Sequence, residues 1–358
     1  MVKAYNSKVT LLYITLLIVV SILACTNIEP TATPIITTVE IEKIVDVEKS
    51  TGNLIIYSGR SESLISPIIK QFSEASGINV KVKYAKSSQL ASLLLEEANK
   101  TPADVFFAQD PGALGAVEDN MQNLPDSIMS LVPKWAKSTN NKWIGISGRA
   151  RTVVYNTAKL EASELPDDMW GFTDPKWNGK IGWAPTNASF QTMVTAMRSS
   201  WGEEKTEEWL NGIQSNNPKL YPKNTPQVAA AAIGEIDVGF VNHYYLHRFT
   251  STEGSGFAAR NYHPRAGGPG SVIMVAGAGI LNTAENRSNA EKFLRFMLSP
   301  IAQQYFSSKT FEYPVIDGVE HSVVLVPLED INPPNIPLSD MADLAGTIAL
   351  LQKTGILP

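Results

Sequence analysis

The stretch that decides the fold is DVGFVNHYYLHR, residues 237–248. Its first half is an apolar, β-branched run from Val238 to Val241 that follows a Gly-Glu turn, and it predicts a buried strand. Its second half becomes polar and aromatic at Asn242. We therefore expect a strand that ends where a binding site begins.

Two adjacent tyrosines, Tyr244 and Tyr245, follow that strand. A tyrosine pair commonly packs with its rings half-buried and its hydroxyls in water. In a doubly wound sheet, however, ligands bind beyond the carboxyl ends of the strands, where a helix start also presents free N–H groups to an anion. Packing and ligand binding are both open for this pair, and the phenols are candidate oxygen ligands.

The composition is that of a folded protein large enough for two lobes. The chain has 358 residues, of which 44% are hydrophobic and 18% are charged, and its formal net charge is −5. Removal of residues 1–24 deletes two lysines and no acid, which moves the charge from −5 to −7. An acidic surface argues against nucleic acid as a partner.

The N-terminus resembles an export signal. Residues 1–24 contain two lysines, then an apolar run too short to span a membrane, and end on Ala24 directly before Cys25. Cys25 is the only cysteine, so it can form no internal disulfide. Ile-Leu-Ala-Cys resembles the bacterial lipobox, which predicts a signal peptide over 1–24 and a lipid-modified Cys25; an incidental thiol after a signal anchor is the alternative.

Residues 25–52 are rich in Thr, Pro, Val, Glu and Lys. The alternation of Val or Ile with charged residues could form a strand. Because prolines precede it and Ser-Thr-Gly follows it, we favour a solvated, lipid-anchored stalk.

Short apolar runs alternate with helical spacing through the body of the chain, which is the rhythm of a parallel α/β sheet. The segment 261–269 has the composition of a loop, and no Walker, zinc-finger or GxGxxG signature occurs. We expect strands near 54–59, 78–84, 103–107, 144–156, 181–183, 219–222, 237–241 and 272–281, with helices near 64–72, 89–95, 190–198, 201–214, 225–233, 290–298, 301–306 and 344–351.

Two further segments carry polar residues suited to an anion. Arg149 and Arg151 lie in the long extended segment where we expect the chain to cross between lobes, and they are either surface charges or a guanidinium fork for carboxylate, phosphate or carbonate. Asn187 and Ser189 lie where a helix should begin. They are either caps or part of an anion site built from the same amides.

Several ordered motifs between Leu54 and Ile316 resemble the ferric-iron-binding proteins of bacterial ABC importers, a branch of the two-lobed periplasmic binding proteins. These motifs are IYSG at 56–59, PADVF at 102–106, SGRAR at 147–151, DPKW at 174–177, NHYY at 242–245 and EYPV at 312–315.

The resemblance implies an α/β, two-lobed periplasmic-binding-protein fold of type II, in which each lobe is a mixed sheet flanked by helices and a hinge opens the cleft. On this basis lobe 1 comprises residues 53–150 with a return segment 275–320, and lobe 2 comprises residues 151–274 with the C-terminal segment 321–358.

The resemblance also implies that Tyr244 and Tyr245 are phenolate ligands of Fe³⁺. A hard cation favours oxygen donors, and a trivalent metal can deprotonate a phenol whose free pKa is about 10. Two phenolates leave one positive charge for a synergistic anion such as carbonate, phosphate or citrate. Family members hold that anion with residues that correspond to Asn187, Ala188, Ser189 and Asn242, with Arg149 beside them.

This chain departs from the family at three ligand positions. Ser61 and Gln109 stand where some relatives have histidine and glutamate, and Ser189 stands where others have a further tyrosine. The protein would therefore supply fewer ligands and depend more on the anion or water. Tyr57 is either a third ligand or a packing residue. We expect a helix to begin at Asn242, which would turn His243 away from one or both tyrosines.

We expect an exported lipoprotein, periplasmic or on the outer face of the cell membrane, that captures ferric iron as a monomer and delivers it to an ABC permease with a cytoplasmic ATPase. The alternative is the same fold binding a metal-free anion such as phosphate, sulfate or an organic acid. No Ser/His/Asp order, HExxH run or paired carboxylates support an enzyme.

Overall fold

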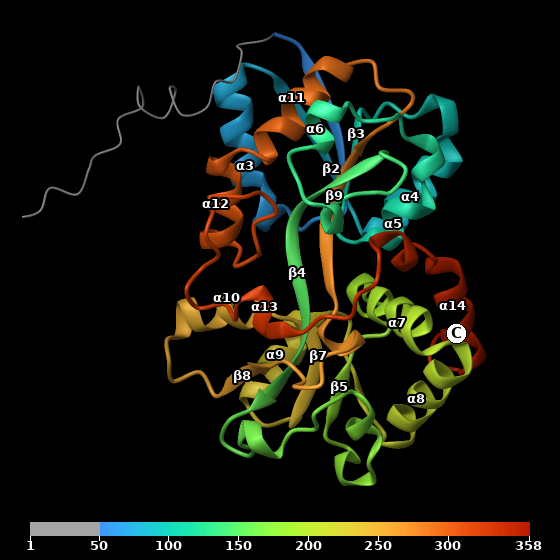
Figure 1. Cartoon of the computed structure of the whole chain (residues 1–358), viewed down its shortest axis with the longest axis vertical. Helices are drawn as coiled ribbons and strands as arrows, with labels where there is room; N and C mark the ends of the chain where they lie inside the picture. Colours follow the sequence, from blue (N-terminus) through green and yellow to red (C-terminus); the bar gives the residue numbers. More distant parts are fainter. Residues whose placement is uncertain (1–50) are drawn as a thin grey trace, which may run out of the picture. The chain divides into compact units, whose positions relative to one another are not determined.

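A computed structural model describes residues 51–358 of the chain (Figure 1). The predicted signal peptide, Cys25 and all but the last two residues of the predicted stalk lie outside the described residues. Within the described part, no helix combines the length and the apolar character needed to cross a membrane.

The strands of the described residues form one mixed sheet in the order β2-β1-β3-β9-β4-β7-β5-β6, and β8 also pairs with β4. Pairing is parallel between β1 and its neighbours β2 and β3, whereas β9 runs antiparallel to β3 and β4. The strands are β1 (Asn53–Ser58), β2 (Asn79–Tyr84), β3 (Val105–Ala108), β4 (Trp143–Asn156), β5 (Ile181–Trp183), β6 (Lys219–Leu220), β7 (Val238–Asn242), β8 (Ala259–Tyr262) and β9 (Ile273–Ile280).

Helices flank the sheet, as Figure 1 shows. The α-helices are α3 (Glu62–Ser76), α4 (Ser87–Glu97), α5 (Pro111–Ala116), α6 (Asp126–Met129), α7 (Ala188–Trp201), α8 (Glu203–Ser215), α9 (Asn224–Ala232), α10 (Tyr244–Glu253), α11 (Arg287–Met297), α12 (Pro300–Lys309), α13 (Leu328–Ile331) and α14 (Leu344–Lys353). Short 3₁₀ turns are η1 (Ala98–Lys100), η2 (Glu118–Asn120), η3 (Lys134–Ala136), η4 (Ala162–Glu164), η5 (Trp170–Thr173), η6 (Pro175–Trp177), η7 (Pro269–Ser271) and η8 (Leu338–Met341).

The long strand β4 joins two parts of the sheet. Its residues 143–150 pair with β9, and its residues 151–156 pair with β7 and β8. We call the part built on β1, β2, β3 and β9 the first lobe, and the part built on β5, β6, β7 and β8 the second lobe. Every residue of β4 is buried, so the crossing is firmly embedded in the fold.

Each lobe has its own aromatic core. In the first lobe the ring of Phe72 on α3 packs 5.3 Å from those of Phe293 and Phe296 on α11. In the second lobe the ring of Phe240 on β7 lies 5.6 Å from Phe172 and 5.7 Å from Trp209. Edge and tilted ring contacts of this kind stabilise each core beyond the area that they bury.

The observed elements agree with most of the expected ones, with two corrections. Residues 259–262, half of which we expected to be loop, form β8, because pairing with β4 supplies the backbone partners that the sequence alone does not show. The helix expected to begin at Asn242 begins at Tyr244, since Asn242 still pairs with Arg151 in the sheet.

The C-terminal segment contacts both lobes. The turn η8 packs against α5 and α7, and α14 packs mainly against α7. The approach to α5 is close: a Cβ atom placed on Gly115 would lie 2.3 Å from the Cβ of Ala342, so only glycine fits there. On the side of α7, the hydroxyls of Thr195 and Thr347 are 2.7 Å apart.

Candidate functional site

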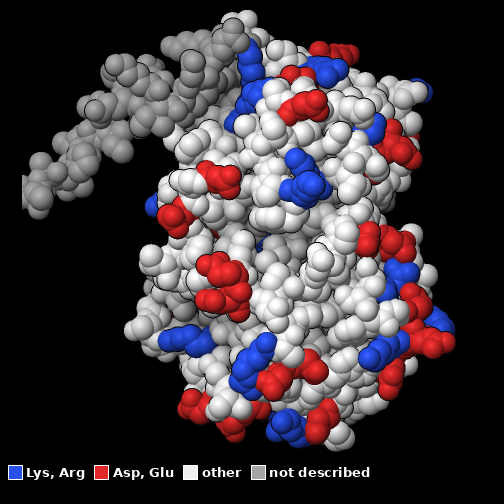
Figure 2. Space-filling view, viewed as in Figure 1, with Lys and Arg blue, Asp and Glu red and all other residues white. Residues whose placement is uncertain are grey.

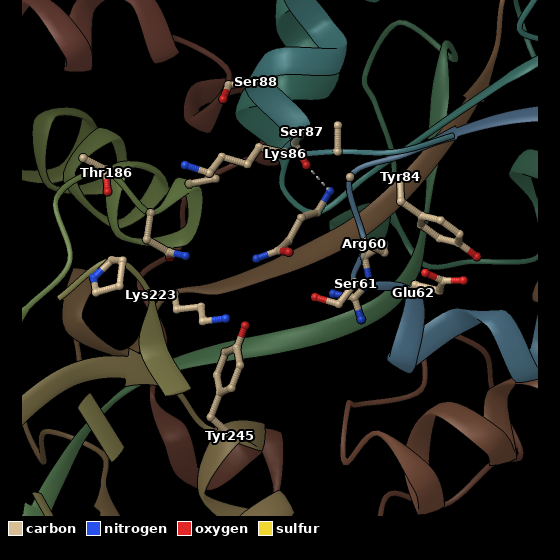
Figure 3. A pocket seen from close by; sticks show the side chains of 16 residues that line it. Arg60, Ser61, Glu62, Tyr84, Lys86, Ser87, Ser88, Thr186, Lys223 and Tyr245 are labelled. Atoms are coloured by element: carbon tan, nitrogen blue, oxygen red, sulfur yellow. Dashed lines mark hydrogen bonds between the residues drawn. The ribbon is translucent and has the colours of Figure 1, made fainter. Parts of the chain in front are cut away.

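A pocket of about 360 Å³ lies between the two lobes (Figure 3). Its first-lobe wall comes from the residues that follow β1, β2 and β3, and its second-lobe wall comes from the starts of α7, α9 and α10. It is lined by Gly59, Arg60, Ser61, Glu62, Tyr84, Ala85, Lys86, Ser87, Ser88, Gln109, Thr186, Asn187, Ala188, Pro222, Lys223 and Tyr245.

Four helices begin at this pocket. The N-cap residues of α3, α4, α7 and α9 all belong to its lining, and they are Ser61, Lys86, Asn187 and Lys223. Only Asn187 caps its helix with a side-chain hydrogen bond, accepting from the backbone N–H groups of Ser189 and Phe190 at 3.1 and 3.4 Å. Helix starts carry partial positive charge and unpaired N–H groups, so this convergence favours an anionic ligand.

The tyrosine pair lies on the second-lobe wall at the start of α10. The phenol of Tyr245 points into the pocket in Figure 3, whereas Tyr244 is fully buried behind it. The two rings stack with centroids 4.3 Å apart, and the Tyr244 hydroxyl has no hydrogen-bond partner among the described residues. Burial, and then the adjacent Tyr244 phenol, raise the pKa of Tyr245, while Arg60 and Arg149 act to lower it.

Arg60 brings a buried positive charge from the first lobe toward the tyrosines. Its side chain pairs with the carboxylate of Glu312, which also accepts a hydrogen bond from the hydroxyl of Ser147. Burial lowers the pKa of Arg60, but the Glu312 carboxylate and the two phenols outweigh it and leave the pKa raised. Its Nε and Nη1 have no partner among the described residues.

The predicted basic pair on β4 is buried, which removes the interpretation as surface charges. Arg149 donates to the carbonyl of Val275 at 3.4 Å, and Arg151 donates to the side chain of Asn242 at 2.9 Å. Each keeps two guanidinium nitrogens without a partner in the described part of the chain. Burial, and then Arg149, lower the pKa of Arg151 to about 9. Such buried cations call for an anion.

The predicted anion-binding residues lie together on the second-lobe wall. Asn187 and Ala188 line the pocket, whereas Ser189 and Asn242 are buried just behind it. The Asn242 side-chain amide donates to the Ser189 hydroxyl at 3.1 Å. Ser189 also accepts a long contact of 3.5 Å from Gln109, so this network reaches across to the first lobe.

The first-lobe positions that depart from the family do converge on the pocket. Ser61 and Gln109 both line it, and Gln109 is held by a hydrogen bond from its backbone N–H to the Ser87 hydroxyl at 2.9 Å. Both side chains are neutral, so this wall offers weak donors to a metal. Its one carboxylate in the pocket is that of Glu62, which sequence reasoning did not single out.

Tyr57 is not part of this group. Its hydroxyl donates to Glu97 at 3.1 Å, its ring lies under the amine of Lys83 at 5.0 Å, and it does not line the pocket. Of the two interpretations left open for Tyr57, the geometry matches packing.

His243 is engaged with the backbone, and its ring also lies edge-on to that of Tyr244, with centroids 5.8 Å apart, so it is not turned away from both tyrosines. Its ring nitrogens lie 3.1 Å from the N–H of Ala150 and 2.7 Å from the carbonyl of Phe311. Burial, followed by the neighbouring His247 and His263, lowers its pKa well below the usual value, so the ring stays neutral. Among residues 51–358, no group of three or more His, Cys, Asp or Glu side chains could hold a metal.

Sequence reasoning missed the cations of the pocket lining, Arg60, Lys86 and Lys223. Arg60 could have been found, because it directly follows the first strand and its glycine turn, where ligands bind in such sheets. The two lysines gave no local signal, since each is one of many lysines in the chain. On the face shown in Figure 2, acidic and basic side chains are interspersed, without a broad basic surface of the kind that binds nucleic acid.

Comparison with known proteins gave concordant results. A family model described as bacterial extracellular solute-binding protein matches residues 89–343. The major ferric iron-binding protein of Neisseria meningitidis serogroup A is 31% identical over 317 residues, which span 85% of this chain and 93% of that protein.

Two solved structures show the same fold. Iron-bound HitA from Pseudomonas aeruginosa has a TM-score of 0.81 at 29% identity, covering 85% of this chain and 99% of that chain. A Trichodesmium protein in complex with iron and citrate ligands has a TM-score of 0.75 at 29% identity, again covering 85% of this chain and 99% of that chain.

Proposed function

Because the chain belongs to the family of bacterial extracellular solute-binding proteins, we propose that it captures ferric iron between its lobes together with a synergistic anion. The observation that carries this proposal is the stacked pair of Tyr244 and Tyr245, buried at the carboxyl end of β7 within reach of buried guanidinium charges. It is a binding protein, as its relatives are, and not an enzyme.

The phenols would bind Fe³⁺ as phenolates. Burial opposes their ionisation in the free protein, so the metal must supply the favourable interaction, with Arg60 and Arg149 assisting Tyr245. Iron binding would thus release protons and weaken as the pH falls. The described residues offer no alternative set of imidazole, thiolate or carboxylate ligands.

The anion would lie between the second-lobe wall and β4, among the residues predicted from the sequence: Arg149, Asn187, Ala188, Ser189 and Asn242. The cap of α7 and the unpartnered guanidinium nitrogens support this placement, because both favour negative charge. Carbonate, phosphate and citrate remain the candidate anions.

Capture would close the two lobes about β4, and release would reopen them. We propose that lobe 1 comprises residues 53–150 and 275–320, and that lobe 2 comprises residues 151–274 and 321–358. We also propose that the protein acts as a monomer, without nucleic acid, and hands its iron to an ABC permease driven by a cytoplasmic ATPase.

Export and membrane attachment are proposed from the sequence alone. Residues 1–24 would direct secretion, and a lipid on Cys25 would hold the protein at the outer face of the membrane or in the periplasm through the stalk at 25–52. Labelling of cells with a radioactive fatty acid should mark the wild-type protein and leave Cys25→Ser unlabelled.

Replacement of both tyrosines by phenylalanine tests the iron site. Iron-loaded wild-type protein should show the visible charge-transfer band of a phenolate–iron bond, and Tyr244→Phe/Tyr245→Phe should lose the band and at least a hundredfold in iron affinity. Circular dichroism and the melting temperature would establish that the variant is folded. A double variant that keeps both colour and affinity would refute the proposal.

A second function, binding of a metal-free anion such as phosphate, sulfate or an organic acid, is favoured by the unpartnered nitrogens of Arg149 and Arg151. Calorimetric titration of metal-stripped protein with each anion separates the two functions. Tight binding without iron would establish the second one, and binding only in the presence of iron would exclude it.

A further inference from the structure

Arg151 lies behind the pocket wall and reaches it through the side chain of Asn242. Arg151 on β4 and Asn242 on β7 are directly opposite residues of neighbouring antiparallel strands, so their side chains share one face of the sheet. Arg151 donates to the Asn242 side-chain oxygen at 2.9 Å. Both residues are fully buried, and neither lines the pocket. Any effect of this hydrogen bond on a bound anion must therefore pass through Asn242.

The chemistry of arginine fixes the orientation of the Asn242 amide. A guanidinium has N–H donors and no acceptor, so only the oxygen of the amide can face Arg151. The amide nitrogen must then face the opposite way, where it donates to the hydroxyl oxygen of Ser189 at 3.1 Å. The direction of both hydrogen bonds therefore follows from the presence of Arg151.

The same reasoning leaves the Ser189 hydroxyl as a donor. Its oxygen has two lone pairs, and it accepts from Asn242 and, over the longer contact of 3.5 Å, from Gln109 of the first lobe. Its one hydrogen has no acceptor among residues 51–358. Ser189 directly follows Asn187 and Ala188, which line the pocket, so this hydrogen is available to an anion held at the start of α7.

Stability does not account for a guanidinium at this place. Within the described part of the chain, Arg151 forms no ion pair, and its Nε and Nη2 have no hydrogen-bond partner. A fully buried cation without a carboxylate is costly, and an apolar side chain of similar volume would destabilise the fold less. The arrangement instead matches a role in orienting the polar groups of the wall.

We propose that Arg151 is a positioning residue, which turns the Asn242 amide so that the Ser189 hydroxyl donates its hydrogen to the anion bound with iron. This inference rests on the proposed iron-binding function and adds a residue that acts on the anion without touching it. Without Arg151 the amide of Asn242 is free to rotate. Ser189 can then donate to the amide oxygen, and the hydrogen is lost to the anion.

A double-mutant cycle between Arg151 and Ser189 tests this role, because Asn242 lies between them. The measured quantity is the anion enhancement, which is the ratio of iron affinity with saturating phosphate or bicarbonate to that without either anion. Affinities come from competition with nitrilotriacetate. Ser189→Ala and Arg151→Met should each lower the enhancement about tenfold. Because both break the same chain of hydrogen bonds, the double variant should lie within about threefold of the more affected single variant.

Arg149→Met is the matched control for the loss of charge. It removes a buried guanidinium from the same strand, but Arg149 donates to the carbonyl of Val275 and not to Asn242. Its loss should therefore multiply with that of Ser189→Ala. Arg151→Lys keeps a donor for the Asn242 oxygen and has no acceptor, so its anion enhancement should stay within about threefold of the wild type.

Multiplying losses in Arg151→Met/Ser189→Ala would show that Arg151 acts on the anion directly through its charge, and would overturn the proposal. An unchanged enhancement in Arg151→Met would overturn it as well. Circular dichroism establishes that each variant is folded. If Arg151→Met is not, Arg151→Gln replaces it in the cycle, because glutamine has both a donor and an acceptor and so cannot fix the direction of the Asn242 amide.

The wild-type protein separates this failure from failure of the proposed function. If neither phosphate nor bicarbonate raises its iron affinity, the proposed anion site fails and the role of Arg151 fails with it. If the wild type shows a clear enhancement and the losses multiply, iron capture with an anion stands and only the positioning role of Arg151 is refuted.

Discussion

The two walls of the pocket differ in how firmly the structure fixes their chemistry. On the second-lobe wall, Tyr244, Ser189 and Asn242 are buried and joined to the core of β7 and α7 by stacking and hydrogen bonds. On the first-lobe wall, Ser61 and Gln109 are neutral side chains at the ends of β1 and β3, with one contact across the cleft. Substitutions in the second-lobe wall would disturb the core into which it is built. Residues at the strand ends of the first-lobe wall can be substituted without disturbing the fold.

Arg60 and Glu312 form a fully buried ion pair behind the first-lobe wall, and breaking this pair should have the largest effect. Glu312→Leu leaves a fully buried guanidinium without its partner, which should lower the free energy of unfolding by about 3 to 5 kcal/mol in urea denaturation at pH 7. Arg60→Met/Glu312→Leu should recover most of that loss, because it removes both charges.

The exposed pair of Lys70 and Glu74 on α3 is the control for this experiment. Glu74→Gln should change the free energy of unfolding by less than about 0.5 kcal/mol. Equal effects of the two single substitutions would show that Arg60 and Glu312 are more hydrated than their burial indicates.

Replacement of Ser61 and Gln109 by the residues that some relatives carry tests the difference in metal-binding chemistry between the two walls. Ser61→His/Gln109→Glu adds an imidazole and a carboxylate facing the phenols, and we expect iron affinity to rise about tenfold in competition with a chelator. Ser61→Ala/Gln109→Ala should stay within about threefold of the wild type. A large loss in the alanine variant would mean that this wall already supplies essential ligands.

The helix caps of the two walls should respond unequally. Asn187 accepts two backbone hydrogen bonds at the start of α7, so Asn187→Ala should cost about 1 kcal/mol of stability. Ser61 makes no side-chain cap on α3, and Ser61→Ala should change stability by less than about 0.3 kcal/mol. Thermal melts of both variants without iron measure the difference, and equal shifts would contradict it.

The smallest predicted effect is the pH dependence of stability that arises from the partly buried His263. Burial lowers the pKa of His263 from 6.5 to about 4, so the unfolded chain binds a proton between these values while the folded protein does not. Stability should therefore fall as the pH drops from 6.5 toward 4, and His263 should account for less than about 1 kcal/mol between pH 6.5 and 5.5.

Urea titrations at several pH values measure this slope, with His263→Gln as the test variant. The substitution should make the slope shallower without removing it, because burial also lowers the pKa values of His243 and His247. An unchanged slope in His263→Gln would show that His263 titrates alike in both states.

The fold could be predicted from the sequence because its strands and helices have strong periodicity and its motifs resemble a known family. Residues 181–183 formed a strand at the expected bounds, and the strand expected over 237–241 is observed as β7, shifted by one residue. The strand β8 could not be predicted in the same way, because its stability comes from pairing with β4, about a hundred residues earlier in the chain.

The candidate site could be predicted only where local sequence carries its chemistry. Tyr245 and Asn187, which line the pocket, could be proposed because they follow a strand or begin a helix, whereas Ala188 was proposed only from the family resemblance. The pairing of Arg60 with Glu312 joins residues 252 positions apart, and no local pattern reports such a contact. The buried group of Arg60, Arg149 and Arg151 likewise appears only when the fold brings distant residues together.

The C-terminal segment also sets an order of events during synthesis. All strands of both lobes are complete once Ile280 has been made, but η8 and α14, which occupy the surfaces of α5 and α7, begin only at Leu338. The strands of a nascent chain can therefore pair before the C-terminal segment covers α5 and α7. At that stage Gly115 does not yet contact Ala342. The segment that contacts both α5 and α7 is therefore among the last parts of the chain to be translated.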